Sequence, residues 1–75
     1  MYELLVGILV DELELDGRGV GPDTSREDAG LDSLAVVELS IILRQRHNLQ
    51  VSDRELLQTS RVSDIVRIMQ ERAGS

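Results

Sequence analysis

Residues 30–47 read GLDSLAVVELSIILRQRH, and this stretch decides the fold of the chain. A glycine and a leucine come before Asp32 and Ser33, and both of these are residue types that commonly cap the N-terminus of a helix. Apolar residues then recur at helical spacing as far as His47, where an asparagine follows. The sequence therefore predicts a helix over about residues 33–47.

The predicted helix carries two apolar stripes instead of one. At about 100° per residue, the first stripe forms the natural core face, and it consists of Val36, Leu39, Ile42 and Leu43. The second lies on the opposite side and consists of Leu34, Val37 and Ile41. A surface helix needs only one stripe, so the second has two explanations. Either the bundle covers both sides of the helix, or the second stripe stays exposed as a docking strip for partners.

The segment before this helix predicts one earlier helix and a long loop. Apolar residues recur at helical spacing over about residues 2–15, and the glycine-rich stretch that follows ends the pattern. From there to Leu31 the chain is expected to be a loop, with a single short turn over residues 24–27. We expect Val20 and Leu31 to fix this loop to the core.

Two more helices are predicted after the central one. A short helix spans about residues 53–58, because the sequence SDRE at its start matches the capping-box pattern. The last helix spans about residues 61–72, with Thr59 or Ser60 as its cap and a single apolar stripe. Residues 1–75 are therefore expected to form one all-α domain, a small bundle of three main helices and one short helix.

Composition and charge exclude several classes of function. The 75 residues include no cysteine, which excludes disulfides and cysteine-ligated zinc. The net charge of −6 argues against a nucleic-acid partner. We find no secretory signal and no apolar run long enough to cross a membrane, so we expect a cytoplasmic protein with no membrane partner. The first forty residues hold ten acids against two arginines, which suits either solubility or docking onto basic surfaces.

The chain lacks the groups that hydrolytic or metal-dependent catalysis requires. Its only histidine, His47, lies at the other end of the predicted helix from Ser33. At 1.5 Å per residue the two are roughly 20 Å apart, too far for a Ser–His pair. The acid-rich residues 11–17 have leucines at the ligand positions of a calcium loop. We therefore predict no metal site and no enzymatic activity.

The sequence Gly-Leu-Asp-Ser-Leu at residues 30–34 resembles the phosphopantetheine attachment motif of acyl carrier proteins. The resemblance extends over nearly the whole chain, through its length, acidity, long first loop and helix spacing. It implies that a phosphopantetheinyl transferase attaches 4'-phosphopantetheine from coenzyme A to Ser33, with Asp32 and Leu34 framing the arm. The thiol of the arm then holds acyl groups as thioesters, while the protein supplies positioning and recognition.

The same resemblance implies a surface that partner enzymes read. It comprises Val37, Glu38 and Ile41 on the central helix, with Arg44 farther along the same helix. The expected partners are the transferase, acyl-loading enzymes, ketosynthases and other acyl-processing enzymes. We expect the carrier itself to be a monomer.

Two departures from the usual fatty-acid carrier favour another pathway. Ala35 stands where an acid commonly follows the Asp-Ser-Leu triplet, and Arg44 and Gln45 stand where the recognition helix usually carries acids. Because like charges repel, Arg44 disfavours partners with basic patches. We therefore expect a carrier of polyketide or related specialised biosynthesis. The alternatives are a fatty-acid carrier, an aminoacyl or peptidyl carrier of a peptide-synthetase pathway, and an unmodified interaction module with a carrier-like fold.

Overall fold

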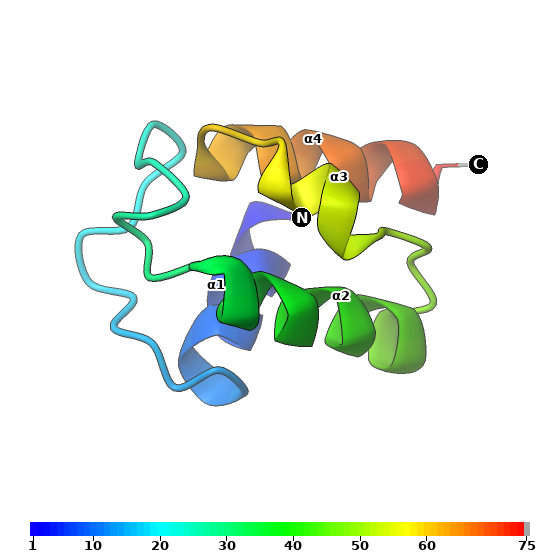
Figure 1. The fold of residues 1–75 in the computed structure, drawn as a ribbon, viewed down its shortest axis with the longest axis horizontal. Helices are drawn as coiled ribbons and strands as arrows, with labels where there is room; N and C mark the ends of the chain where they lie inside the picture. The colour runs from blue at the N-terminus through cyan, green and yellow to red at the C-terminus, as the bar shows by residue number, and fades with distance from the viewer. Residues whose placement is uncertain (75) are drawn as a thin grey trace.

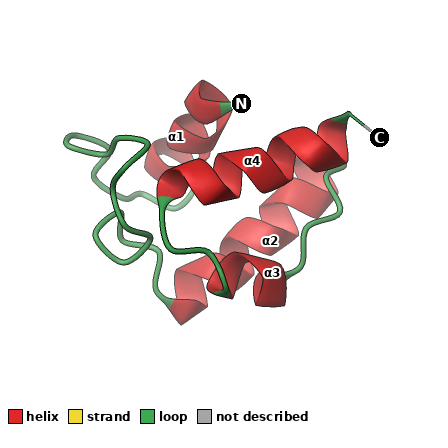
Figure 2. Ribbon diagram, turned by 90° about the horizontal axis from the view of Figure 1, so that it is seen from above, coloured by secondary structure: helices red, strands yellow, loops and turns green. Residues whose placement is uncertain are grey.

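The computed structural model describes residues 1–74, which form four helices and no β-strand. The helices are α1 (Tyr2–Asp11), α2 (Ser33–His47), α3 (Asp53–Leu57) and α4 (Val62–Ala73). α3 packs against α2, and α1 packs against α4. The long loop between α1 and α2 covers the end of the molecule at which α2 and α4 begin (Figure 1 and Figure 2). The predicted all-α bundle with a long first loop is confirmed.

The core is aliphatic, and every helix contributes to it. Its fully buried members include Leu5 from α1, Leu56 from α3 and Ile65 from α4. The core face predicted for α2 is confirmed for Val36, Leu39 and Leu43, which are buried, while Ile42 is half-buried at the edge of the cluster. Ser40 is the one buried polar side chain among the described residues, and its hydroxyl donates to the carbonyl oxygen of Val37 at 2.7 Å.

The first helix ends earlier than predicted, at Asp11 instead of about residue 15. The N–H groups of Glu12 and Leu13 both donate to the carbonyl oxygen of Ile8 at 3.0 Å, so the helical ladder stops there. Glu14 then takes a φ of 57°, in the left-handed region. The apolar residues that follow, Leu13 and Leu15, still pack against the core, but from an irregular segment. The apolar pattern of these residues therefore reflects tertiary packing, and helical periodicity alone predicted the end of the helix wrongly.

The last two helices differ from their predicted bounds by one residue. α3 ends at Leu57, and its predicted capping box is present. α4 spans 62–73 instead of 61–72, and the prediction that Thr59 or Ser60 caps it is wrong. The Thr59 hydroxyl donates instead to the carbonyl oxygen of Leu56 at 2.6 Å. The residue that stabilises the start of α4 lies within the helix itself. The carboxylate of Asp64 accepts hydrogen bonds from the N–H groups of Ser60 and Arg61, which precede the helix.

The carboxylate at the start of α4 is stabilised in its charged form. Asp64 accepts from the N–H of Arg61 at 3.1 Å and from the N–H of Ser60 at 3.2 Å. These two hydrogen bonds lower the pKa of Asp64 from its ordinary value. A negative charge at this position also suits the positive end of the helix dipole.

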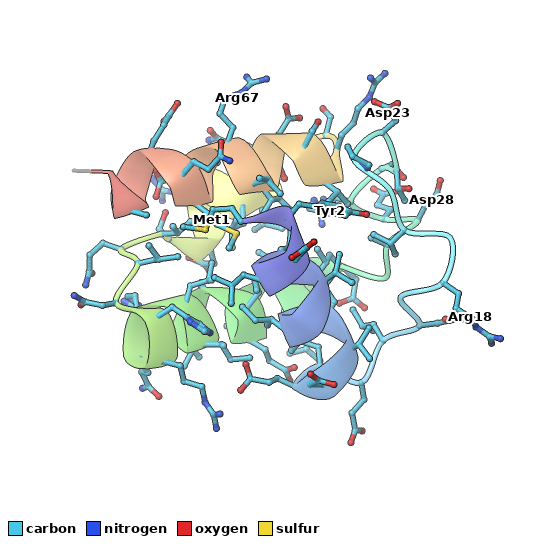
Figure 3. All side chains as sticks on the ribbon, turned by 180° about the vertical axis from the view of Figure 1, so that it is seen from behind. Met1, Tyr2, Arg18, Asp23, Asp28 and Arg67 are labelled. Carbon is cyan, nitrogen blue, oxygen red and sulfur yellow. The ribbon has the colours of Figure 1, made fainter. Side chains whose placement is uncertain are left out.

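The long loop is tied to both neighbouring helices. Val20 and Leu31 pack with the core, as predicted. The hydroxyl of Tyr2 donates to the carbonyl oxygen of Val20 at 2.7 Å, and Figure 3 shows the Tyr2 side chain extending toward the loop. Arg18, by contrast, projects into solvent from the same loop (Figure 3).

A second set of hydrogen bonds joins the loop to the start of α4. The N–H of Val62 donates to the carbonyl oxygen of Thr24 at 2.9 Å, and the N–H of Arg26 donates to the carbonyl oxygen of Ser60 at 2.9 Å. The predicted short turn lies in this region, where the Ser25 hydroxyl accepts from the N–H of Asp28 at 3.0 Å. The loop therefore connects the beginnings of α2 and α4 through its backbone.

Candidate functional site

Ser33 is the first residue of α2, and its side chain is exposed. The preceding residue, Asp32, is the N-cap, and its carboxylate accepts from the N–H of Ala35 at 2.8 Å. The cap is therefore Asp32, the first of the two candidates that the sequence offered. Because Asp32 fulfils the capping role, the hydroxyl of Ser33 is not committed to the helix.

The first turn of α2 leaves backbone donors next to this hydroxyl. The first N–H groups of any helix have no partner within the helix. At this end, the N–H of Ala35 goes to the Asp32 carboxylate and the N–H of Val36 goes to the Asp32 carbonyl oxygen. The N–H groups of Ser33 and Leu34 donate to no group within residues 1–74. These donors and the positive end of the helix dipole favour a phosphate attached to Ser33.

The second apolar stripe of α2 is exposed at the surface, most strongly at Leu34, and continues along the helix from Ser33. The exposed fractions are 69% for Leu34, 37% for Val37 and 39% for Ile41. Val36, next in the chain to Val37, is fully buried on the opposite face. Of the two explanations for the second stripe, the structure excludes the one in which the bundle covers both sides. We call Leu34, Val37 and Ile41 the exposed strip.

The charges beside the exposed strip change sign along the helix. Glu38 is exposed near the middle, and Arg44 is exposed toward the C-terminal end. Within the described residues Arg44 forms no ion pair, whereas Arg46 binds Glu12, the residue that follows α1, at 2.7 Å. Arg44 is therefore available to an outside partner, while Arg46 is paired with the C-cap residue of α1. The structure thus places all the residues predicted to contact partners on the surface of α2.

The site is a surface and not a cleft. A groove of about 630 Å³ lies between α1 and the C-terminal end of α2, and its lining includes Arg46 and His47 but not Ser33. His47 is the last residue of α2 and Ser33 is the first, so the helix separates them as the sequence predicted. Among residues 1–74, no three histidine, cysteine or acidic side chains come together as metal ligands. No helix in that part of the chain is long and apolar enough to cross a membrane.

One residue beside the site was not predicted from the sequence. Arg26 of the long loop is half-buried, and its guanidinium Nη1 donates to the carbonyl oxygen of Leu31, two residues before Ser33. The loop holds two arginines among its acidic residues, Arg18 and Arg26, and nothing in the sequence distinguishes the second from the first. The contact depends on the path of the loop, which no local pattern encodes.

Comparison with known proteins identifies similar chains over this whole region. The family described as "phosphopantetheine attachment site" matches residues 3–69. The acyl carrier protein of Phytoplasma australiense is 36% identical over 67 residues, covering 88% of each chain. That of Solidesulfovibrio magneticus is 31% identical over 68 residues, 89% of this chain and 87% of the relative. That of Helicobacter pylori is 28% identical over 72 residues, 95% of this chain and 92% of the relative. The match with the family covers α2 and α3 in full and most of α1 and α4, and it therefore includes Ser33.

Proposed function

The chain belongs to the acyl carrier protein family, whose members hold a covalently attached 4'-phosphopantetheine, and from this membership we propose that Ser33 is the attachment residue. The observation that carries the proposal is the exposed Ser33 hydroxyl at the first residue of α2, inside the region that matches the family. Members of this family are carriers and not catalysts. We accordingly assign this chain the role of presenting a substrate to separate enzymes.

The residues around Ser33 fit a phosphodiester. The N–H groups of Ser33 and Leu34 have no acceptor in the described chain, and the dipole of α2 adds positive potential at the same point. The nearest acid, Asp32, already uses its carboxylate to accept from the N–H of Ala35. The exposed position of the serine also leaves the hydroxyl open to a large modifying enzyme.

The attachment is a phosphoryl transfer from coenzyme A to the Ser33 hydroxyl. A bond forms between the serine Oγ and the phosphorus that bears pantetheine, and the pyrophosphate bond of coenzyme A breaks. Adenosine 3',5'-bisphosphate leaves, and the hydroxyl proton passes to a base that the transferase supplies. Once bound, the arm supplies a thiol on which acyl groups are carried as thioesters. Asp32 and Leu34 flank the attachment point.

The exposed strip supports docking by the transferase and by acyl-processing enzymes. Leu34, Val37 and Ile41 present apolar area on one face of α2 that starts beside Ser33. An apolar helix face of this kind matches the helix-in-groove mode of recognition, with charged residues at its border selecting the partner. Glu38 and Arg44 lie at that border. Docking next to the serine also makes reaction with the tethered group effectively intramolecular.

We assign the carrier to polyketide or related specialised biosynthesis on the charge of this border. Arg44 is exposed and forms no ion pair with any described residue, and Ala35 offers no acid beside the arm. A positive end of the strip favours acidic partner surfaces and disfavours basic ones. Acyl-loading enzymes and ketosynthases with acidic docking patches are therefore the expected partners.

Intact-mass measurement tests the attachment directly. The protein is incubated with coenzyme A and a transferase of broad specificity, and a gain of the mass of the arm is expected for the wild type and for Ser60→Ala. Ser60 is exposed at the start of α4 and serves as the matched control. Ser33→Ala should gain nothing, and a gain of the arm by this variant would refute the assignment. A wild type that stays unmodified would instead favour an interaction module with an unmodified serine.

Loading assays distinguish the remaining carrier classes. The modified protein is offered to acyl-activating enzymes and, separately, to amino-acid-activating enzymes. Thioester formation with the first group supports an acyl carrier, and formation with the second alone supports a carrier of a peptide-synthetase pathway. Comparing fatty-acid with polyketide ketosynthases then tests the pathway.

A further inference from the structure

Arg26 forms hydrogen bonds with both backbone polar groups of Leu31, its N–H and its carbonyl oxygen. The carbonyl oxygen of Arg26 accepts from the N–H of Leu31 at 3.0 Å, and its guanidinium donates to the carbonyl oxygen of Leu31. The N–H of Arg26 in turn donates to the carbonyl oxygen of Ser60 at 2.9 Å. One loop residue therefore joins the entry to α2 with the entry to α4.

This arrangement includes two contributions to the free energy of folding that are unfavourable. Nε of Arg26 is buried and has no hydrogen-bond partner among residues 1–74. Within the same residues no carboxylate forms an ion pair with its guanidinium. A buried donor without an acceptor and a half-buried charge without a counter-charge both oppose folding. An apolar side chain of similar length would fill the same space without either cost, so the arginine calls for another explanation.

The segment that Arg26 holds leads directly to the reactive serine. Leu31 is fully buried, and Gly30 before it takes a φ of +89°, so the backbone turns sharply at this point. Asp32 follows as the cap of α2, and Ser33 is the next residue. The Leu31 carbonyl thus lies two residues before Ser33 on the loop side, and the guanidinium of Arg26 fixes its direction.

We propose that Arg26 is a positioning residue for Ser33. Its guanidinium sets the orientation of the Leu31 peptide, and through it the first turn of α2, so that the Ser33 hydroxyl meets the transferase in one orientation. Arg26 lies on the loop, whereas the exposed strip lies on α2. Its removal should therefore disturb the reaction more than the docking of the partner. This inference rests on the proposed attachment at Ser33.

The test is steady-state transfer of the arm by the transferase to purified apo-protein, comparing wild type, Arg26→Met and Arg18→Met. Methionine keeps an unbranched apolar side chain but offers no donor to the Leu31 carbonyl. We expect kcat for Arg26→Met to fall roughly tenfold with KM within about twofold, because small errors of alignment lower the rate without weakening binding. Arg18, 94% exposed on the same loop, is the control, and its variant should match the wild type.

The same variants are unfolded in denaturant to separate positioning from folding. Methionine removes the unpartnered Nε but also the donor to the Leu31 carbonyl, and because these two effects oppose each other the midpoint of Arg26→Met should stay close to that of the wild type. Arg26→Lys keeps a donor that is one atom shorter, and it should recover part of kcat. Failure of Arg26→Met to fold, an unchanged kcat, a change confined to KM, or no recovery with lysine would each overturn the proposal.

The outcome also separates this inference from the proposed function. If the wild type is not modified at all and Ser33→Ala behaves identically, the attachment at Ser33 is wrong. If the wild type is modified at Ser33 and Arg26→Met is modified at the same rate, only the role of Arg26 is wrong.

Discussion

Arg72, in the last turn of α4, forms an ion pair with Glu55 of α3. The same carboxylate closes the capping box of α3, accepting from the N–H of Ser52 at 3.0 Å and from its hydroxyl at 3.2 Å. Arg72 also donates to the carbonyl oxygen of Gln50 at 3.2 Å. A single side chain, Glu55, therefore both starts the shortest helix and joins it to the last one.

Stability is expected to fall in acid partly through this carboxylate. The hydrogen bond from the N–H of Ser52 is the main cause that lowers the pKa of Glu55 below its ordinary value of 4.5, with a further contribution from the charge of Arg72. A carboxyl with a lowered pKa in the folded state contributes stability above its unfolded pKa, and this contribution is lost as the pH falls through the folded pKa. Denaturant midpoints measured from about pH 6 to about pH 3 should therefore decrease less in Glu55→Gln than in the wild type. Glu27→Gln, in the exposed loop, is the control, and equal slopes for both variants would contradict the assignment.

Substitutions at Asp32 and Ser33 should show that Asp32 caps α2 and that Ser33 does not. Asp32→Ala removes the acceptor for the N–H of Ala35 and should lower the free energy of unfolding by about 1 kcal/mol. Ser33→Ala removes an exposed hydroxyl that does not cap the helix, so stability should change by less than about 0.5 kcal/mol. Thermal or denaturant unfolding of the two variants checks this, and the opposite order would make Ser33 the cap.

The adjacent valines of α2 give a direct test of the exposed strip. Val37→Asp places a charge at a position that is 37% exposed, so stability should change by only about 0.5 kcal/mol. Transfer of the arm to Ser33 should nevertheless slow sharply, because the transferase loses apolar contact beside the serine. Val36→Asp buries the same charge in the core and should unfold the protein. Melting curves and transfer time courses distinguish the two, and unimpaired transfer by folded Val37→Asp would move the partner surface elsewhere.

Truncating the aliphatic core should be costly. Leu39 and Ile65 are fully buried, and changing either to alanine should lower the free energy of unfolding by about 2–5 kcal/mol. Leu57 of α3 is 40% exposed, and its alanine variant should cost much less. Urea unfolding at one temperature provides the comparison. Equal midpoints for Leu39→Ala and Leu57→Ala would mean that the core face of α2 is assigned wrongly.

Reversing the charge of Arg44 should change partner preference without changing the fold. Arg44→Glu should speed recognition by a transferase with a basic docking patch and slow recognition by partners with acidic patches, most clearly at low salt. Arg67→Glu, an exposed change on α4, keeps the net charge equal and serves as the control. Association rates at two salt concentrations measure the effect, and identical rates for both variants would remove Arg44 from the partner surface.

The sequence predicted α2 well because its signals are local. A capping residue, a continuous run of helix-compatible residues and an asparagine that takes a left-handed conformation at Asn48 all lie within the segment itself. The end of α1 was misplaced because Leu13 and Leu15 continue the apolar pattern of the helix but pack against the core from an irregular segment. In that case tertiary packing overrode periodicity.

The site was predicted in part for the same reason. The position of Ser33 at a helix start follows from local sequence, and the structure confirms it. The exposure of the second stripe did not follow, since periodicity shows that two faces are apolar but not which one the rest of the bundle covers. The contact of Arg26 with Leu31 was not predictable, because it depends on how a long irregular loop returns to the core.

Tyr2 is the only aromatic residue of the chain, and its hydroxyl binds the carbonyl oxygen of Val20. At wavelengths longer than those absorbed by the peptide bonds, the absorption and fluorescence of the polypeptide therefore come from Tyr2. This residue lies where the long loop meets α1. The tyrosine emission should change when the loop detaches from α1. It should change very little when α3 alone opens locally. Tyr2 is thus an intrinsic spectroscopic probe of the contact between the long loop and α1, and no added label is needed.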